Sequence, residues 1–252
     1  MSRAAALLAP LMLGTALLAG CEARDDSSDR PATAREFPRP YRPVSEGGSN
    51  TFSTEVQRDS VNEARTVMDL AAIRAGMTVA DIGAGEGYYT VRLAERVGEK
   101  GRVLAQDIDK AALERLGARV ERERLDNVSI KQGEVDDPHL PVGSFDRVFL
   151  VHMYHEVGEP YAFLWRLWPA LRPNGKVIVV DLDRRTDQHG IPPTLLFCEM
   201  GAVGFRLTQF VRKPELQGYF AEFEATGERP EPGAIKPCGK TDKPSVSGQG
   251  GT

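Results

Sequence analysis

Short runs of apolar residues alternate with amphipathic segments through the middle of this 252-residue chain. Each run has the length of a β-strand, and each is followed, or nearly so, by a segment of helical periodicity. The predicted strands are Thr78–Ile82, Arg102–Asp107, Val128–Gln132, Asp146–Val151 and Lys176–Asp181. Strands that alternate with helices form a parallel sheet covered by helices. The order therefore predicts an α/β fold, a single doubly wound, Rossmann-like domain.

Three segments that follow predicted strands carry apolar residues three or four positions apart, as one face of a helix does. These residues are Tyr89, Leu93 and Val97, then Leu113, Leu116 and Val120, then Leu164, Leu167 and Leu171. Pro160 stands where the third helix would begin, and the Pro-Asn-Gly sequence at 173–175 where it would end. Two last apolar runs, 205–211 and 217–225, predict an antiparallel pair at the sheet edge. The expected sheet has seven strands, mostly parallel, with an antiparallel edge strand.

The two ends of the chain differ in composition from this domain. Residues 1–20 contain one arginine, an apolar run too short to span a membrane and then small residues, which is typical of a signal peptide. Residues 21–51 are rich in Pro, Ser, Arg and Asp and predict a flexible tether. Residues 226–252 lack periodicity and predict a disordered tail. The domain predicted between them covers residues 52–225.

The signal segment ends in Leu-Ala-Gly-Cys at 18–21, which resembles a bacterial lipobox. That resemblance implies that Cys21 is lipidated and anchors the mature protein to a membrane of the cell envelope, facing the periplasm. Two alternatives stay open, an ordinary signal peptide cut after an alanine and a misassigned start codon. Cys198 and Cys238 remain as possible thiols, and the sequence does not say whether they pair.

The charge and the metal-binding residue types exclude several function classes. A formal net charge of −4 gives no basic excess for general nucleic-acid binding, so no nucleic-acid partner is expected. The three cysteines are too scattered for a zinc site, and the four histidines lack metal-ligand spacing. We therefore expect a small-molecule substrate and no metal.

Three alternating glycines follow the first predicted strand. The sequence there is Asp81-Ile82-Gly83-Ala84-Gly85-Glu86-Gly87. Glycines at a strand-to-helix turn let the backbone approach a ligand, and the helix N-terminus offers free N–H groups. A dinucleotide fingerprint needs a glycine at the sixth position from Gly83, where this chain has Tyr88. A nicotinamide-dependent oxidoreductase is therefore a weak alternative.

The second predicted strand ends in an acid, Asp107. A carboxylate at this strand tip can accept hydrogen bonds from two ribose hydroxyls. Asp107 could instead be the N-cap of the following helix, a position that Asp109 could equally fill.

Together with later motifs, these residues resemble class I S-adenosylmethionine-dependent methyltransferases. The later motifs are Gln-Gly-Glu-Val at 132–135, Gly-Ser-Phe-Asp at 143–146 and Leu-Arg-Pro-Asn-Gly at 171–175. Glu134 and Val135 replace the family's usual Asp-Ala, and Asn174 replaces a glycine that needs a left-handed conformation, which asparagine tolerates. The resemblance covers about residues 58–225.

The resemblance implies S-adenosylmethionine as cofactor. It places the methionine part on the glycine turn and its preceding acid, the ribose on Asp107, and adenine between Ile108 and the 134–135 pair. The implied cofactor-binding residues are Asp81, Gly83, Ala84, Gly85, Gly87, Asp107, Ile108, Glu134 and Val135.

Candidate catalytic and substrate-side residues follow the fourth and fifth strands. His152 and His155 are candidate general bases, because a histidine with a pKa near ~6.5 suits proton removal from a phenol, enol or amine. His152 could instead only pack beside the sulfonium, since methyl transfer needs mainly alignment. Tyr154 and His189 are candidate substrate-side residues, although His189 could equally lie in a polar connection before a helix.

The sequence thus predicts an S-adenosylmethionine-dependent methyltransferase with an unidentified, small-molecule acceptor. One fact opposes this interpretation, because the cofactor is made in the cytoplasm and a lipobox directs export. The alternative is a non-catalytic, membrane-tethered lipoprotein that keeps the fold for binding a ligand or a partner.

Overall fold

The computed structural model describes residues 29–45, 54–213 and 218–239. The chain divides into residues 1–30 and 31–252, and every element below belongs to the second unit. The predicted signal peptide and Cys21 lie outside the described residues. Among the residues that are described, no helix is both long and apolar enough to cross a membrane.

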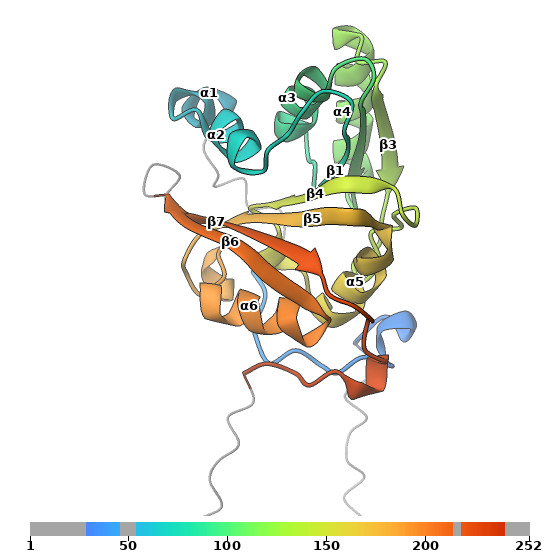
Figure 1. Cartoon of the computed structure of the whole chain (residues 1–252), viewed down its shortest axis with the longest axis vertical. Helices are drawn as coiled ribbons and strands as arrows, with labels where there is room; N and C mark the ends of the chain where they lie inside the picture. Colours follow the sequence, from blue (N-terminus) through green and yellow to red (C-terminus); the bar gives the residue numbers. More distant parts are fainter. Residues whose placement is uncertain (1–28, 46–53, 214–217, 240–252) are drawn as a thin grey trace, which may run out of the picture. The chain divides into compact units, whose positions relative to one another are not determined.

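A seven-stranded sheet forms the centre of this unit, in the order β3-β2-β1-β4-β5-β7-β6 (Figure 1). The strands are β1 (Thr78–Ile82), β2 (Arg102–Asp107), β3 (Val128–Gln132), β4 (Phe145–Val151), β5 (Leu171–Asp181), β6 (Phe205–Lys213) and β7 (Gly218–Ala225). Strands β1 to β5 pair in parallel, and β7 runs antiparallel between β5 and the edge strand β6. The predicted mostly parallel α/β sheet with an antiparallel edge pair is confirmed.

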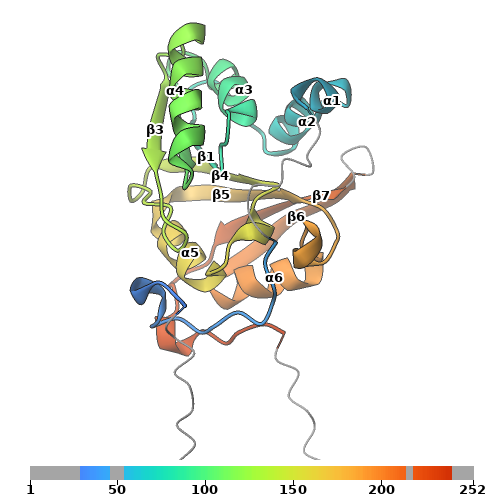
Figure 2. The ribbon, with the colours of Figure 1, turned by 180° about the vertical axis from the view of Figure 1, so that it is seen from behind.

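In the part of the chain that the structure describes, six α-helices cover the two faces of this sheet. They are α1 (Glu55–Ser60), α2 (Glu63–Leu70), α3 (Tyr88–Val97), α4 (Lys110–Glu123), α5 (Pro160–Leu167) and α6 (Pro193–Ala202). Both ribbon views place α1 to α4 on one side of the sheet and α5 and α6 on the other (Figures 1 and 2).

The central strands bury side chains on both faces, because successive residues of a strand point in opposite directions. Val148 and Leu150 of β4 pack with α5 and α6, whereas Phe149 between them packs with α2 and α3. Double-sided burial explains why these strands are apolar runs rather than alternating patterns.

Helix α5 ends earlier than the sequence predicts. It begins at Pro160 but ends at Leu167, because Pro169 has no N–H to continue the helical hydrogen bonds. The carbonyl of Trp165 accepts a hydrogen bond from Arg229 instead, at 2.6 Å. Leu171 therefore opens β5 and is not on the helix, and the predicted turn at 173–175 lies inside that strand. Asn174 there has a φ of +66°, as expected for a residue in a glycine position.

Two segments outside the predicted domain pack against it. Phe37 is 2% exposed and stacks edge-on against Trp165, with ring centroids 5.5 Å apart. Ile235 and Cys238 are also buried. The predicted flexible tether and disordered tail are therefore wrong for residues 31–45 and 226–239, because a few specific anchors outweigh the polar average composition. Residues 240–252 lie outside the described residues.

Arg42 is the main polar anchor of the N-terminal segment. Its Nε donates to Glu199 of α6 at 2.8 Å, and the two side chains are only 3% and 1% exposed. Its remaining N–H groups donate to backbone carbonyls, including that of Val157 at 3.0 Å. Tyr154 completes the group by donating its hydroxyl hydrogen to the other Glu199 oxygen at 2.8 Å.

A disulfide between Cys198 and Cys238 fastens the C-terminal segment to α6. We expect its reduction to lower the free energy of unfolding by about 3 kcal/mol, because the bond closes a long loop in the unfolded chain. Urea unfolding with and without a phosphine reductant measures this. The double variant Cys198→Ser/Cys238→Ser serves as control and should not respond to reductant. Equal unfolding midpoints for the oxidised and reduced protein would contradict the prediction.

Candidate functional site

A pocket of about 350 Å³ opens at the carboxyl ends of β1, β2 and β4. Strand order reverses between β1 and β4, and ligands of open α/β sheets bind at such a point. Six of the residues predicted from sequence line this pocket. They are Gly83, Asp107, Ile108, Glu134, Val135 and His152.

The glycine turn after β1 is shaped by close contacts. Gly83 has a φ of +68°, and a Cβ there would lie 2.9 Å from Cγ of Met153. Gly87 has a φ of +89°, and a Cβ there would lie 2.4 Å from Leu116 of α4. Left-handed backbone and missing space together require glycine at both positions. Ala84 is buried and packs in the same cluster as Leu116.

The Asp107 carboxylate is held by backbone groups at the tip of β2. It accepts hydrogen bonds from the N–H of Gly85 at 2.8 Å and of Asp109 at 2.9 Å. Each carboxylate oxygen keeps a further lone pair for a ligand. Asp109 is the N-cap of α4, because its side chain accepts from the N–H of Ala111 at 2.8 Å. The geometry therefore favours Asp107 as a ligand-binding residue over the capping role.

Asp81 lies one layer beneath the pocket. It is 3% exposed, and its carboxylate accepts a hydrogen bond from the Thr90 hydroxyl of α3 at 2.6 Å. Burial raises the pKa of Asp81 to about 6. Asp81 therefore braces the glycine turn from below and does not line the cavity.

Two apolar side chains on the rim are unusually exposed. Ile108 is 52% exposed and Val135 is 48% exposed, although both border the pocket. Exposed apolar side chains beside a cavity are typical of a surface that a ligand covers. These are two of the residues beside which the sequence resemblance places the adenine ring.

His152 follows β4 and lies between the pocket and α2. Its side chain is 10% exposed, and its Nε2 is 3.6 Å from Oε1 of Glu63. Its φ is +54°, which is uncommon for a residue with a side chain. The N–H of His152 donates to the carbonyl of Val180 at 2.8 Å and helps to hold this conformation. Backbone strain that the fold maintains beside a cavity indicates a functional position.

Glu63 of α2 is a site residue that the sequence analysis missed. It is 5% exposed and accepts hydrogen bonds from Arg58 at 2.5 Å and from the Tyr89 hydroxyl at 3.1 Å. Burial alone raises the pKa of Glu63, but hydrogen bonds from His152 and Arg58 lower it to about 2. Glu63 is therefore a carboxylate at neutral pH, directed at the imidazole. No local motif marks a glutamate that only the packing of α2 brings to β4.

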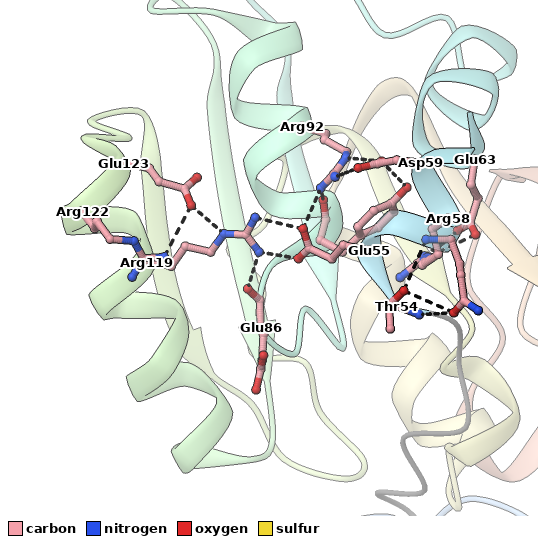
Figure 3. A network of polar contacts seen from close by, with 12 residues as sticks. Thr54, Glu55, Arg58, Asp59, Glu63, Glu86, Arg92, Arg119, Arg122 and Glu123 are labelled. Atoms are coloured by element: carbon pink, nitrogen blue, oxygen red, sulfur yellow. Dashed lines mark hydrogen bonds and ion pairs between the residues drawn. The ribbon is translucent and has the colours of Figure 1, made fainter. Parts of the chain in front are cut away.

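Ion pairs hold α1 and α2 against α3 and α4, and so hold Glu63 in place (Figure 3). Arg92 of α3 pairs with Asp59 at 2.5 Å, and Arg119 of α4 pairs with Glu55 at 2.5 Å. Both acids belong to α1, and Arg58 of α1 in turn pairs with Glu63 of α2.

The other predicted catalytic and substrate-side residues lie outside the pocket lining. His155 is fully buried, and its Nδ1 is 3.0 Å from both carboxylate oxygens of Asp181. Tyr154 is fully buried with its hydroxyl bound to Glu199. The structure thus contradicts His155 as a base for a substrate in this pocket and Tyr154 as a substrate contact, because acids hold both side chains in the interior. His189 packs against His155, with ring centroids 5.8 Å apart.

The sequence of this domain matches a known family. Residues 73–200 match the family described as a methyltransferase domain, and this region contains the glycine turn, Asp107 and His152. The chain belongs to this methyltransferase family.

Two curated relatives of this chain carry specific names. Nocamycin O-methyltransferase of Saccharothrix syringae is 33% identical over 114 residues, which are 45% of this chain and 41% of that protein. The ubiquinone/menaquinone biosynthesis C-methyltransferase UbiE of Escherichia fergusonii is 26% identical over 126 residues, 48% of each chain. The chain thus spans less than half the length of these two relatives.

A solved structure shares the fold. A SAM-dependent methyltransferase from Aquifex aeolicus superposes with a TM-score of 0.61 at 24% identity, over 67% of this chain and 92% of that one. The expected methyltransferase family is confirmed. The expected fold is confirmed by its likeness to this solved structure. S-adenosylmethionine remains the cofactor that the sequence resemblance implies.

Proposed function

We propose that the whole protein transfers a methyl group from S-adenosylmethionine to a small-molecule acceptor, and that lipidated Cys21 holds it on the bacterial cell envelope. The observation that carries the activity is the pocket at the strand-order reversal, where Asp107 lies between the glycine turn and the apolar rim. The Asp107 carboxylate suits the ribose of the cofactor, and the backbone amides of the glycine turn suit its amino-acid part. The apolar rim suits the adenine.

His152 is the residue best placed to act on an acceptor. It is the one predicted catalytic residue that lines the pocket, and the Glu63 carboxylate faces its ring. A carboxylate beside imidazole orients the ring and stabilises the imidazolium that forms when it takes a proton.

The two curated relatives are named for O- and C-methylation, which supports an acceptor whose oxygen or carbon carries an acidic proton. S-adenosylmethionine supplies the activated methyl group. His152 takes the acceptor proton, and the freed electron pair forms the bond to the methyl carbon. The electron pair of the broken carbon–sulfur bond stays on sulfur.

Turnover tests the activity directly. The full chain is incubated with S-adenosylmethionine and a panel of phenols, quinols and enols, and S-adenosylhomocysteine is measured. We expect His152→Gln to lower kcat about 100-fold, as is usual for loss of a general base, with cofactor affinity nearly unchanged. His139→Gln changes a histidine outside the pocket and should leave kcat unchanged. A folded chain that binds neither S-adenosylmethionine nor S-adenosylhomocysteine would support the non-catalytic lipoprotein instead.

The envelope location has separate support. A structural disulfide is typical of proteins in oxidising compartments, and Cys198 is bonded to Cys238. We expect the wild-type chain to fractionate with membranes and Cys21→Ser to be released from them. Equal distribution of the two proteins would contradict lipid anchoring without affecting the proposed activity.

Asp81 gives the cofactor affinity an expected pH dependence. Asp81 lies beneath the glycine turn and does not line the pocket, so the positive amino group of S-adenosylmethionine bound above the turn would favour its ionised form through space. Its pKa in the ligand-free protein is about 6. Below that pH the carboxyl must first lose its proton, so affinity should fall about tenfold for each pH unit. Isothermal titration across this range measures the effect, and Asp81→Asn should bind weakly and without the pH dependence.

The raised pKa of Asp81 also makes the stability of the ligand-free protein depend on pH. This stability falls as the pH rises, whereas the cofactor affinity increases. The stabilising contribution of Asp81 is fully present below its ordinary pKa of 3.8 and is lost as the pH rises through about 6.

A cofactor affinity that stays constant from neutral pH down to about pH 5 would contradict the role of Asp81 in cofactor binding.

A further inference from the structure

We propose that His155, Glu156 and His189 form a binding site for a divalent transition-metal ion at the wall of the pocket. Each residue offers one ligand atom, and these three atoms all lie within 4.8 Å of one another. His155 is fully buried, and the other two are partly buried. Sequence reasoning predicted no metal, because His155 and His189 are far apart along the chain.

The spacing of the ligand atoms suits a small cation. Ligands about 2.1 Å from a tetrahedral zinc ion lie about 3.4 Å from each other. In the structure, Nε2 of His155 is 3.8 Å from Oε1 of Glu156. All three ligand atoms lie within 4.8 Å of one another, so side-chain movements of about 1 Å would bring them to the spacing around an ion.

Asp181 orients His155 as the outer carboxylate of a metal-bound histidine does. Its oxygens lie 3.0 Å from Nδ1 of His155, and one of them also accepts from the N–H of Leu182 at 2.8 Å. A carboxylate that accepts these bonds places the ring hydrogen on Nδ1. The lone pair is then on Nε2, on the side of Glu156. Such an acid–histidine pair is the usual second layer of a metal site.

The local charge also favours a cation. Asp181 and Glu156 bring two carboxylates to the two imidazoles. Arg42 is the nearby cation, since it donates to the carbonyl of His155. Its charge is balanced by Glu199, which lies 2.8 Å from its Nε. Two nitrogens and one oxygen are a ligand set of catalytic zinc and of non-haem iron(II), both of which keep positions open for other ligands.

The position suggests a use for those open positions. Glu156 also lines the cofactor pocket, so a bound ion would lie at its wall. There it could bind an acceptor oxygen and lower the pKa of that hydroxyl, as metal ions do for bound water. This use depends on the proposed methyl transfer, whereas metal binding does not.

Metal binding is tested on the full chain without a histidine tag. The protein is stripped with chelator, dialysed against Zn²⁺, Co²⁺ or Fe²⁺, and analysed for bound metal. The Co²⁺ form is examined by visible absorption. We expect one ion per chain and a Co²⁺ spectrum of low coordination number. Glu156→Gln and His189→Ala should each weaken binding at least tenfold, and His139→Ala, in a histidine outside the cluster, should have no effect.

Asp181→Asn tests the orienting carboxylate and should weaken binding between about tenfold and 100-fold. Circular dichroism and S-adenosylmethionine affinity of every variant show that the fold and cofactor site are intact. A loss of metal binding can therefore be distinguished from a loss of the proposed methyltransferase function. The proposal is overturned if the wild-type chain retains no stoichiometric metal, or if Glu156→Gln and His189→Ala retain it as well as His139→Ala does.

Discussion

Replacing Asp107 with alanine is expected to weaken binding of S-adenosylmethionine by about 100-fold. Its carboxylate is the charged acceptor placed for the two ribose hydroxyls, and hydrogen bonds to a charged group contribute about 1.5–3 kcal/mol each. A loss of about 2.7 kcal/mol corresponds to this factor. The carboxylate also fixes Gly85 through its N–H at 2.8 Å, so the variant loses the shape of the turn as well. Isothermal titration of the full chain measures the affinity.

Asp109→Ala is the matched control for this experiment. Asp109 lies two residues away and caps α4, so its loss should cost about 1 kcal/mol of stability and leave cofactor affinity nearly unchanged. Thermal unfolding of both variants separates affinity from folding. Wild-type affinity in Asp107→Ala would show that the ribose is held elsewhere and would contradict the assignment.

Arg42→Ala is expected to lower the free energy of unfolding by about 4 kcal/mol. The change leaves Glu199, which is 1% exposed in its side chain, as a buried carboxylate without its cation. It also removes the donors to the carbonyls of His155 and Val157. Urea unfolding of the oxidised protein measures this loss.

Two further variants show whether burial is the cause. Arg42→Met combined with Glu199→Leu removes both charges and should be more stable than Arg42→Ala alone, because no buried charge is left unpaired. Arg185→Ala breaks an exposed pair with Asp187 and should leave the unfolding midpoint unchanged. An Arg42→Ala protein that unfolds at the wild-type midpoint would show that the Arg42–Glu199 pair does not contribute to the stability of the domain.

The sequence alone located most of the elements, because their signals are local. β1, β2 and β3 have the predicted bounds, since each is a short segment of strand-forming residues between turn residues. The end of α5 was missed because the helical spacing of Leu164, Leu167 and Leu171 continues past Pro169, whose missing N–H ends the helix. The anchoring of residues 31–45 was missed for a different reason, because Arg42 and Phe37 find partners more than a hundred residues away.

The residues of the candidate site also differ in whether the local sequence could predict them. The glycine turn could be predicted because it lies in one continuous stretch of strand, turn and helix N-terminus, and Asp107 because it ends the next strand. The sequence could not predict that His152, and not His155, lines the pocket. His152 itself has a left-handed backbone conformation after β4, and its ring lies beside Glu63, whereas the ring of His155 lies beside Asp181.

The sequence by itself determined the sheet, the glycine turn and the family of this protein, since these depend on periodicity and contiguous motifs. Only the tertiary structure decided which acid stands behind each histidine, how the chain ends are fastened and where two histidines and a glutamate converge. Those features depend on pairs of polar groups brought together from distant segments, where burial strengthens each interaction and no local pattern records the partner.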